Sequence, residues 1–331
     1  MRAPLELLLL DQPRNSRKIR KDLIGSAHLR NPEFLLDRDY YLECFDRMKA
    51  MASGSDLFLR AGLSPELAPT GLFGKAVIHC ETLWDALTTS KDLLSFLMPG
   101  DTVSYRLTKG RFQIRYVSPF KGRPGTTSHM QHYIALFLYL LRLASWQKDA
   151  NLAVCFPGAH DSYRALIPEA AKLQSGPIGL IEFDDSLLRS PMKNADPLFS
   201  SITLGVIDKI NAQDLNVDDP AKIVAELQFQ SVTAGSSQFR LADAAFLLGL
   251  PVRTLQAQLN ASNTSFAQIR GTVLHKIARQ DLLAGQSLSE TSEKLGFTHR
   301  QSFSEAFTKW EGENPSVFAS RRHSAPRHFT M

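Results

Sequence analysis

The last 95 residues of the chain contain an internal repeat, which limits the fold of that region more than any single motif does. One copy reads LADAAFLLGLPVRTLQAQL (241–259), and the other reads LSETSEKLGFTHRQSFSEAF (288–307). In both copies a leucine precedes a glycine by eight residues, a large apolar residue follows the glycine, and two apolar residues spaced four apart come next. The opening leucines, Leu241 and Leu288, lie 47 residues apart, so the same supersecondary structure is expected twice.

The glycines of the repeat, Gly249 and Gly296, give the spacing a physical meaning. A short helix must end sharply, and glycine takes the left-handed conformation needed there without steric cost. Pro251 in the first copy and Thr298 in the second can then open another helix. Two short helices joined by a tight turn form a helix-turn-helix, whose second helix projects its polar face outward. The predicted motifs cover residues 241–260 and 288–310, joined by a helix over 266–284.

The side chains between the two helices of each motif are expected to be buried. In the second copy Phe303, Phe307 and Trp310 follow the i, i+4, i+7 spacing of one helix face. The leucines at 255 and 259 have the same role in the first copy. The residues predicted to hold the motifs together are Gly249, Leu255, Leu259, Gly296, Phe297, Phe303, Phe307 and Trp310.

Four further patterns surround the second copy: A-x-x-x-L-L at 278–283, L-G-F at 295–297, F-S-x-A-F-x-x-W at 303–310 and G-x-x-P at 312–315. Together they resemble the C-terminal DNA-binding domain of AraC/XylS-type bacterial transcription regulators, over about residues 220–323. The upstream stretches TLWDAL, IEFDDSLLRSPM and ADP are similar to the N-terminal domain of the arabinose-binding-like branch of that family. The resemblance implies a transcription regulator with promoter DNA as its partner.

The resemblance also implies that the second helix of each motif enters the major groove. Helical geometry and the matching family positions select largely the same outward residues: Arg253, Thr254, Gln256, Arg300, Gln301, Ser304 and Glu305. The arginines suit guanine and the glutamines suit adenine, although either arginine could instead hold a phosphate.

Two outward positions depart from the family pattern. Ala257 and Glu305 stand where the family often has arginine. Glu305 could accept from a cytosine amino group, but its charge repels phosphate. From residue 236 to the end the chain has eleven Lys and Arg against seven Asp and Glu, a net charge of +4. This modest charge predicts moderate affinity per monomer and a need for a homodimer or another partner.

The N-terminal part mixes helices with strands. Alternating apolar residues in TVSYRL and RFQIRY, joined by TKG, predict a β-hairpin. A very apolar helix at 132–146 follows, then the strands NLAVCF and PIGLIEF. The expected order is β-β-α-β-β, forming an antiparallel sheet with the helix on one face, unlike a sugar-binding cupin barrel. N-terminal helices cover the other side of that helix, or it lines a ligand cavity.

The predicted fold class is therefore an α+β N-terminal domain followed by an all-α DNA-binding domain with two helix-turn-helix motifs. The predicted divisions are residues 1–190 for effector sensing and dimerisation, 191–235 for a helical linker and 236–325 for DNA binding. An unknown small-molecule effector is expected, and RNA polymerase is a further candidate partner. Activation and repression, the target genes and the dimer surface are not distinguished by the sequence.

Composition excludes several other classes. The chain has 331 residues, 44% hydrophobic and 21% charged, which is ordinary for a folded protein. Its cysteines, Cys44, Cys80 and Cys155, are too scattered for a disulfide framework or zinc site. The uninterrupted apolar run 133–141 is about half of the roughly 20 residues that a membrane span needs. With no signal peptide evident, a cytoplasmic protein is expected.

The basic run RNSRKIRK (14–21) is a solvated face or a phosphate-contacting arm.

Catalytic patterns are sparse. The chain has no GxSxG, HExxH or P-loop pattern. His129 and His132 lie three residues apart but have no evident carboxylate partner, and the loop PGAHDSY (157–163) offers one histidine and one serine. We therefore expect no catalytic residues, no cofactor and no metal. Two alternatives stay open: an interaction scaffold that has lost DNA binding, motivated by Ala257 and Glu305, and a small-molecule enzyme.

Overall fold

In the computed structural model the chain forms two compact units, Met1–Thr203 and Leu204–Met331. The described residues are 38–51, 56–64, 71–98, 100–120, 122–123, 125–144, 151–216 and 219–320. The basic run 14–21 lies outside them. Among the described residues, no helix is long and apolar enough to cross a membrane.

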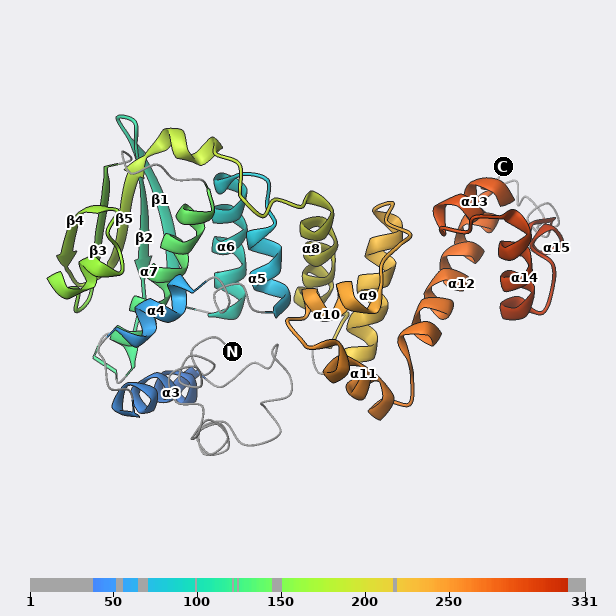
Figure 1. The fold of residues 1–331 in the computed structure, drawn as a ribbon, viewed down its shortest axis with the longest axis horizontal. Coiled ribbons are helices and arrows are strands. Elements are labelled where there is room, and N and C mark those ends of the chain that lie inside the picture. The colour runs from blue at the N-terminus through green and yellow to red at the C-terminus, as the bar shows by residue number, and fades with distance from the viewer. Residues whose placement is uncertain are drawn as a thin grey trace, which may run out of the picture. The chain divides into compact units, whose positions relative to one another are not determined.

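The first unit contains a five-stranded sheet, which lies to one side of its helices (Figure 1). Its strands are β1 (Thr102–Thr108), β2 (Arg111–Val117), β3 (Leu152–Phe156), β4 (Ala170–Ser175) and β5 (Gly179–Asp184). The strand order is β1-β2-β5-β3-β4, an open sheet rather than a closed barrel. The predicted hairpin is confirmed: β1 and β2 pair through a two-residue turn, where Lys109 (φ 50°) and Gly110 (φ 78°) are both left-handed.

The sheet differs from the prediction in two respects. The strand β4 was not predicted, because its sequence AAKLQS is short, polar and without apolar alternation. It pairs in parallel with β3, whereas the other neighbours are antiparallel, so the sheet is mixed rather than wholly antiparallel. The chain order is consequently β-β-α-β-β-β.

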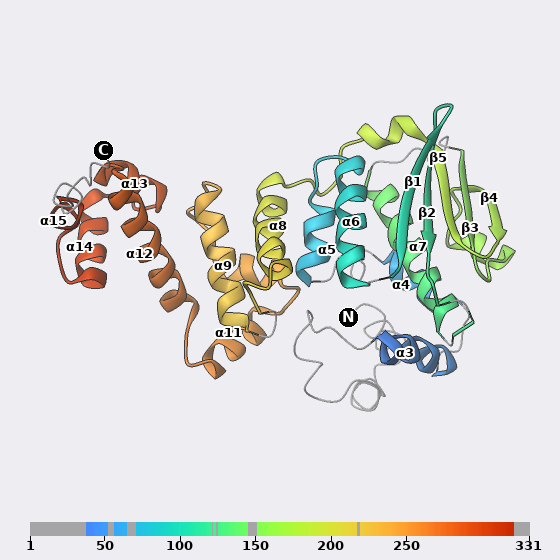
Figure 2. The same ribbon diagram turned by 180° about the vertical axis from the view of Figure 1, so that it is seen from behind.

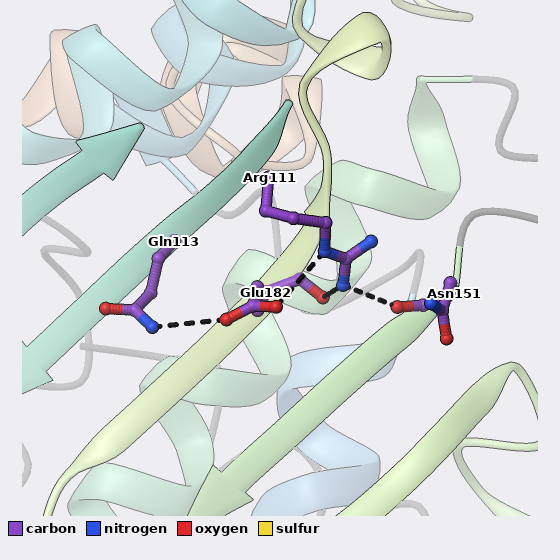
Figure 3. Close-up of polar contacts among 4 residues, drawn as sticks. All are labelled: Arg111, Gln113, Asn151 and Glu182. Atoms are coloured by element: carbon purple, nitrogen blue, oxygen red, sulfur yellow. Dashed lines mark hydrogen bonds and ion pairs between the residues drawn. The ribbon is translucent and has the colours of Figure 1, made fainter. Parts of the chain in front are cut away.

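Polar side chains link strands that are distant in sequence (Figure 3). Arg111 Nε of β2 lies 3.1 Å from Glu182 Oε1 of β5, and the other Glu182 oxygen accepts from Gln113 at 3.3 Å. The Arg111 guanidinium also donates to the backbone oxygen of Asn151, just before β3. These contacts support the arrangement in which β5 lies between the hairpin and β3.

The apolar helix α7 (Thr126–Leu143) packs between the sheet and other helices. The helices α3 (Arg38–Met51), α4 (Leu57–Leu63) and α6 (Leu83–Leu97) contact it, and α5 (Gly71–Ile78) packs against α6. The crossing with α4 is close, because a Cβ added to Gly62 would lie 2.5 Å from the Ala135 Cβ. N-terminal helices therefore cover α7, one of the two explanations that the sequence left open.

The polar segment 190–196 is tied to other parts of the first unit. Pro191 forms a β-bridge with Thr82, and the amide of Asp196 donates to the backbone oxygen of His79 at 2.9 Å. Cys80 and Cys155 are free thiols, the first buried and the second half-buried, whereas the Cys44 side chain lies outside those described. The remaining elements here are the short 3-10 helices η1 (Asp161–Ala165) and η2 (Asp185–Arg189), followed by α8 (Pro197–Asn211), which contains the boundary.

The described part of the second unit is helical (Figure 2). Its helices are α9 (Pro220–Thr233), α10 (Leu241–Leu247), α11 (Val252–Ala261), α12 (Phe266–Ala284), α13 (Leu288–Lys294), α14 (Arg300–Glu311) and α15 (Pro315–Ser320). The predicted helix over 266–284 is confirmed as α12. It packs against α9 and also contacts α13, α14 and α15. Along the chain it lies between the helix pairs α10–α11 and α13–α14.

Candidate nucleic-acid interface

The two helix pairs turn in the same way. Gly249 and Gly296 have positive φ values of 62° and 80°, the left-handed conformation expected of both. The amide after each glycine donates to the carbonyl five residues back, at 2.9 Å in the first pair and 3.0 Å in the second. Each glycine amide also bonds three residues back. Both turns are thus Schellman motifs, which end a helix sharply and satisfy its last carbonyls.

The second helices of the pairs begin differently. Pro251 is the N-cap of α11, as expected. In the other pair the N-cap is His299 rather than Thr298, so the prediction was wrong by one residue. The reason is the longer turn: three residues separate Gly296 from α14, whereas two separate Gly249 from α11.

The inner faces of α11 and α14 are buried. Leu255 and Leu259 are at most 1% exposed, and Phe303 and Phe307 are fully buried. Trp310 and Phe297 are half-buried, and their ring centroids lie 6.3 Å apart. The first pair is therefore held by aliphatic side chains and the second by an aromatic cluster.

A buried carboxylate fixes the end of α14. Glu311, whose side chain is 10% exposed, accepts hydrogen bonds from His275 Nε2 and from the guanidinium of Arg279, both on α12. Burial raises the pKa of Glu311, but the hydrogen bonds from these two groups outweigh it and hold the pKa below its usual value. This contact was not predicted, because nothing in the local sequence pattern links positions 36 residues apart.

The outward faces hold the predicted DNA-binding residues in two sets, one on each second helix. Thr254 and Ser304 are half-buried, and the other five are exposed: Arg253, Gln256, Arg300, Gln301 and Glu305. Within the second set the amide Nε2 of Gln301 donates to Glu305 Oε1 at 3.0 Å. Ala257 is exposed on α11. The helices α11 and α14 therefore each expose a polar face, and each packs its opposite, apolar face against the rest of the unit.

Comparison with known proteins decides the family. Residues 20–192 match the family described as the arabinose-binding domain of AraC transcription regulator, N-term, and residues 244–321 match a helix-turn-helix domain. The chain belongs to the AraC-type transcription regulators. This confirms the resemblance found in the sequence, and both matched families are domains of transcription regulators, which are typically non-enzymatic.

Curated relatives of this regulator match over a short region. Two uncharacterized HTH-type transcriptional regulators, from Mycobacterium bovis and Mycobacterium tuberculosis, are 36% identical to it over 81 residues. The match covers 24% of this chain and 23% of each relative.

Solved structures resemble it loosely. The transcriptional regulator CdpR from Pseudomonas aeruginosa has a TM-score of 0.40 at 15% identity, over 92% of this chain and 97% of its own. A DNA-binding transcriptional dual regulator from Escherichia coli K-12 has a TM-score of 0.29 at 18% identity, over 31% and 94%.

In the N-terminal domain of the regulator, His129 has the carboxylate partner that the sequence did not reveal. Its Nε2 lies 2.8 Å from Asp101 Oδ2, and the Tyr116 hydroxyl donates to the same oxygen at 2.6 Å. Burial raises the pKa of Asp101, but the contacts with His129 and Tyr116 outweigh it and leave the pKa lowered. Burial also lowers the pKa of His132 to about 4. All four side chains are buried, so this is an internal polar cluster.

The other histidine pattern lies at the surface. In the loop 157–163 the Ser162 hydroxyl is 2.7 Å from His160 Nδ1, and both residues are exposed. The neighbouring Asp161 pairs with Arg164. Within the described ranges, no group of three or more His, Cys, Asp or Glu side chains could hold a metal ion.

Proposed function

We propose that this AraC-type regulator binds promoter DNA sequence-specifically through two helix-turn-helix motifs, residues 241–260 and 288–310. One observation carries the proposal: the same Schellman turn occurs twice, and each turn leads into a helix with one buried face and one exposed polar face. A helix supported in this way can enter the major groove, where the edges of all four base pairs differ.

The helices α11 and α14 are the two reading helices of this proposal, and each contributes its own set of contacts with DNA. From α11 these are Arg253, Thr254 and Gln256, and from α14 they are Arg300, Gln301, Ser304 and Glu305. Arginine pairs with guanine through two hydrogen bonds, and glutamine pairs with adenine. Arg300, at the first position of α14, is also well placed for a phosphate, which positions the helix without reading sequence.

The regulator acts as a homodimer in this proposal. The net charge of +4 from residue 236 onward supplies only a modest attraction to DNA, so one monomer binds moderately. Residues 1–190 then serve sensing and dimerisation, 191–235 form a helical linker, and 236–325 bind DNA. Sedimentation of the full chain tests the dimer, and a monomer that binds one and two half-sites equally well would contradict it.

A small-molecule effector controls the regulator in this proposal. The name of the matching N-terminal family supports it, and arabinose is the first compound to test. A raised melting temperature with arabinose, and not with glucose, would support binding. Contact with RNA polymerase is a further proposal, tested by transcription assays in vitro.

The DNA-binding proposal is tested by fluorescence anisotropy with the DNA upstream of the regulator's own gene, at several salt concentrations. Arg300→Ala is expected to weaken specific binding about tenfold. Arg164→Ala is a matched control, because it removes an exposed arginine from the N-terminal domain. No preference over random DNA at any salt concentration would favour the interaction scaffold, and turnover of a small molecule without DNA would favour an enzyme.

A further inference from the structure

The outward faces of α11 and α14 differ at two equivalent positions. Alignment of the inward pairs, 255 with 303 and 259 with 307, places Arg253 opposite Gln301 and Ala257 opposite Glu305. At 3.6 residues per turn, all four positions lie across the helix from the buried pair. The centre of the first face thus presents an arginine beside a methyl group, and the centre of the second presents an amide beside a carboxylate.

The amide and the carboxylate on α14 are joined. A carboxylate only accepts hydrogen bonds, so the nitrogen of the Gln301 amide faces Glu305, at 3.0 Å from Oε1. Gln301 keeps its carbonyl oxygen and one amide hydrogen for another partner. The second oxygen of Glu305, Oε2, accepts no hydrogen bond from the described residues, and Glu305 is exposed.

Base chemistry limits what such a pair can contact. In the major groove guanine offers two acceptors and thymine one acceptor and a methyl group, so both oppose a carboxylate. Cytosine offers only its N4 amino donor there, whereas adenine places the N7 acceptor beside its N6 donor. A carboxylate therefore fits cytosine best. The remaining oxygen and hydrogen of a held glutamine amide match the N6 and N7 edge of adenine.

We propose that Gln301 and Glu305 act as one reading unit, in which Glu305 holds Gln301 against an adenine and accepts from the amino group of a neighbouring cytosine. The inference rests on the proposed DNA-binding function and names the bases that α14 selects. The face of α11 has the opposite chemistry, because Arg253 only donates and suits guanine. The two motifs of one chain then read different sequences, and each monomer binds in one orientation.

The negative charge of Glu305 affects both the affinity and the specificity of DNA binding. An exposed carboxylate on a DNA-facing helix weakens binding to any sequence through phosphate repulsion. That cost falls on all sites alike, whereas the hydrogen bond to cytosine is gained at the matching site only. Glu305 therefore raises specificity while it lowers general affinity, as expected of a residue that selects against wrong sites.

Binding-site selection from randomised duplex DNA tests the unit, with the full-length regulator and its variants. The wild type is expected to select an adenine next to a cytosine, together with a guanine that depends on Arg253. Glu305→Gln keeps the size of the side chain and a partner for Gln301, but it can donate as well as accept. It should lose roughly tenfold of the preference for cytosine over thymine and keep the guanine. Glu305→Ala should also weaken the adenine preference, since Gln301 is no longer held.

Glu293→Gln is the matched control, because it makes the same charge change on the exposed surface of α13. It should tighten binding to all sequences slightly and leave the selected motif unchanged. The proposal is overturned if Glu305→Gln selects the same bases as the wild type while the Arg253-dependent guanine is retained. If no motif is selected by the wild type at any salt concentration, the proposed function fails and this inference fails with it.

Discussion

The two helix pairs of the DNA-binding unit share a turn but differ in the polar groups behind their reading helices. Behind α14 the buried carboxylate of Glu311 is satisfied twice, by His275 and Arg279. Helix α9, which packs against α11 and α12, contains Gln228, a fully buried side chain whose amide nitrogen and oxygen both have no hydrogen-bond partner among the described residues. A buried polar group without a partner costs free energy, so the first pair is expected to be the less stably supported.

This difference shows that the repeated leucine–glycine spacing determines the shape of each helix pair but does not determine its stability. The Schellman turn needs only a glycine and a helix end, and both pairs have them. Stability depends on what fills and satisfies the space behind the turn, which differs between leucines and an aromatic cluster. Substitutions at the close contacts of the second pair should therefore lower the free energy of unfolding most. A substitution behind the first pair can instead raise it.

The largest expected effect is at the second turn. A Cβ at Gly296 would meet the Ser237 Cβ at 2.4 Å, in a residue whose φ is already +80°. Gly296→Ala should lower the free energy of unfolding by about 2–4 kcal/mol, through left-handed strain and the clash together. Urea unfolding of the full chain measures it.

Gly312 provides the control for that experiment, because its φ is +81° and a Cβ there would meet nothing within 4 Å. Gly312→Ala should cost only about 1 kcal/mol, the strain alone. Ser237→Gly should recover part of the loss in the Gly296→Ala background. Equal costs at Gly296 and Gly312 would show that the contact with Ser237 is unimportant.

The next effect comes from the carboxylate clamp. Glu311→Gln should lower the free energy of unfolding by about 1–2 kcal/mol at pH 7, because it weakens two charge-assisted hydrogen bonds. The pKa of Glu311 is lowered in the folded state. Its contribution is therefore complete above the unfolded value of about 4.3 and is lost as the pH falls through the folded pKa.

Unfolding of wild type and variant between pH 7 and pH 3 tests the clamp. The difference between them should shrink as the pH falls below about 5. Glu293→Gln, at an exposed position of α13, should differ from the wild type by less than about 0.5 kcal/mol at neutral pH. A Glu311 difference that grew on acidification would contradict the sign of the pKa shift.

The third effect is a gain. Gln228→Met keeps the volume of the side chain and removes two buried polar atoms without partners. It should raise the free energy of unfolding by about 1 kcal/mol. Gln230→Met, on the same helix, should give no gain, since the Gln230 amide donates to Glu226 at 2.8 Å. If Gln228→Met destabilised the protein, that amide would have a partner or water of its own.

The comparison also shows which features were accessible from the sequence. The turns and α12 were predicted because glycine position and apolar period are local signals. The Glu311 clamp, the Asp101–His129 contact and the parallel strand β4 were not, because each depends on a partner distant in the chain. Local sequence patterns specify the helices and strands of this regulator. The pairing of polar groups across these elements is seen only in the three-dimensional structure.

The smallest effect concerns the first reading helix. Ala257 is exposed at the centre of that face, and Ala257→Arg adds one positive charge there. We expect roughly fivefold tighter DNA binding and a salt dependence steeper by about one charge. Anisotropy titrations at several salt concentrations measure both. Ala284→Arg, exposed at the end of α12, controls for net charge and should change affinity less. Equal tightening by the two variants would mean that position 257 does not face the DNA, and the equivalence of Ala257 with Glu305 would fail with it.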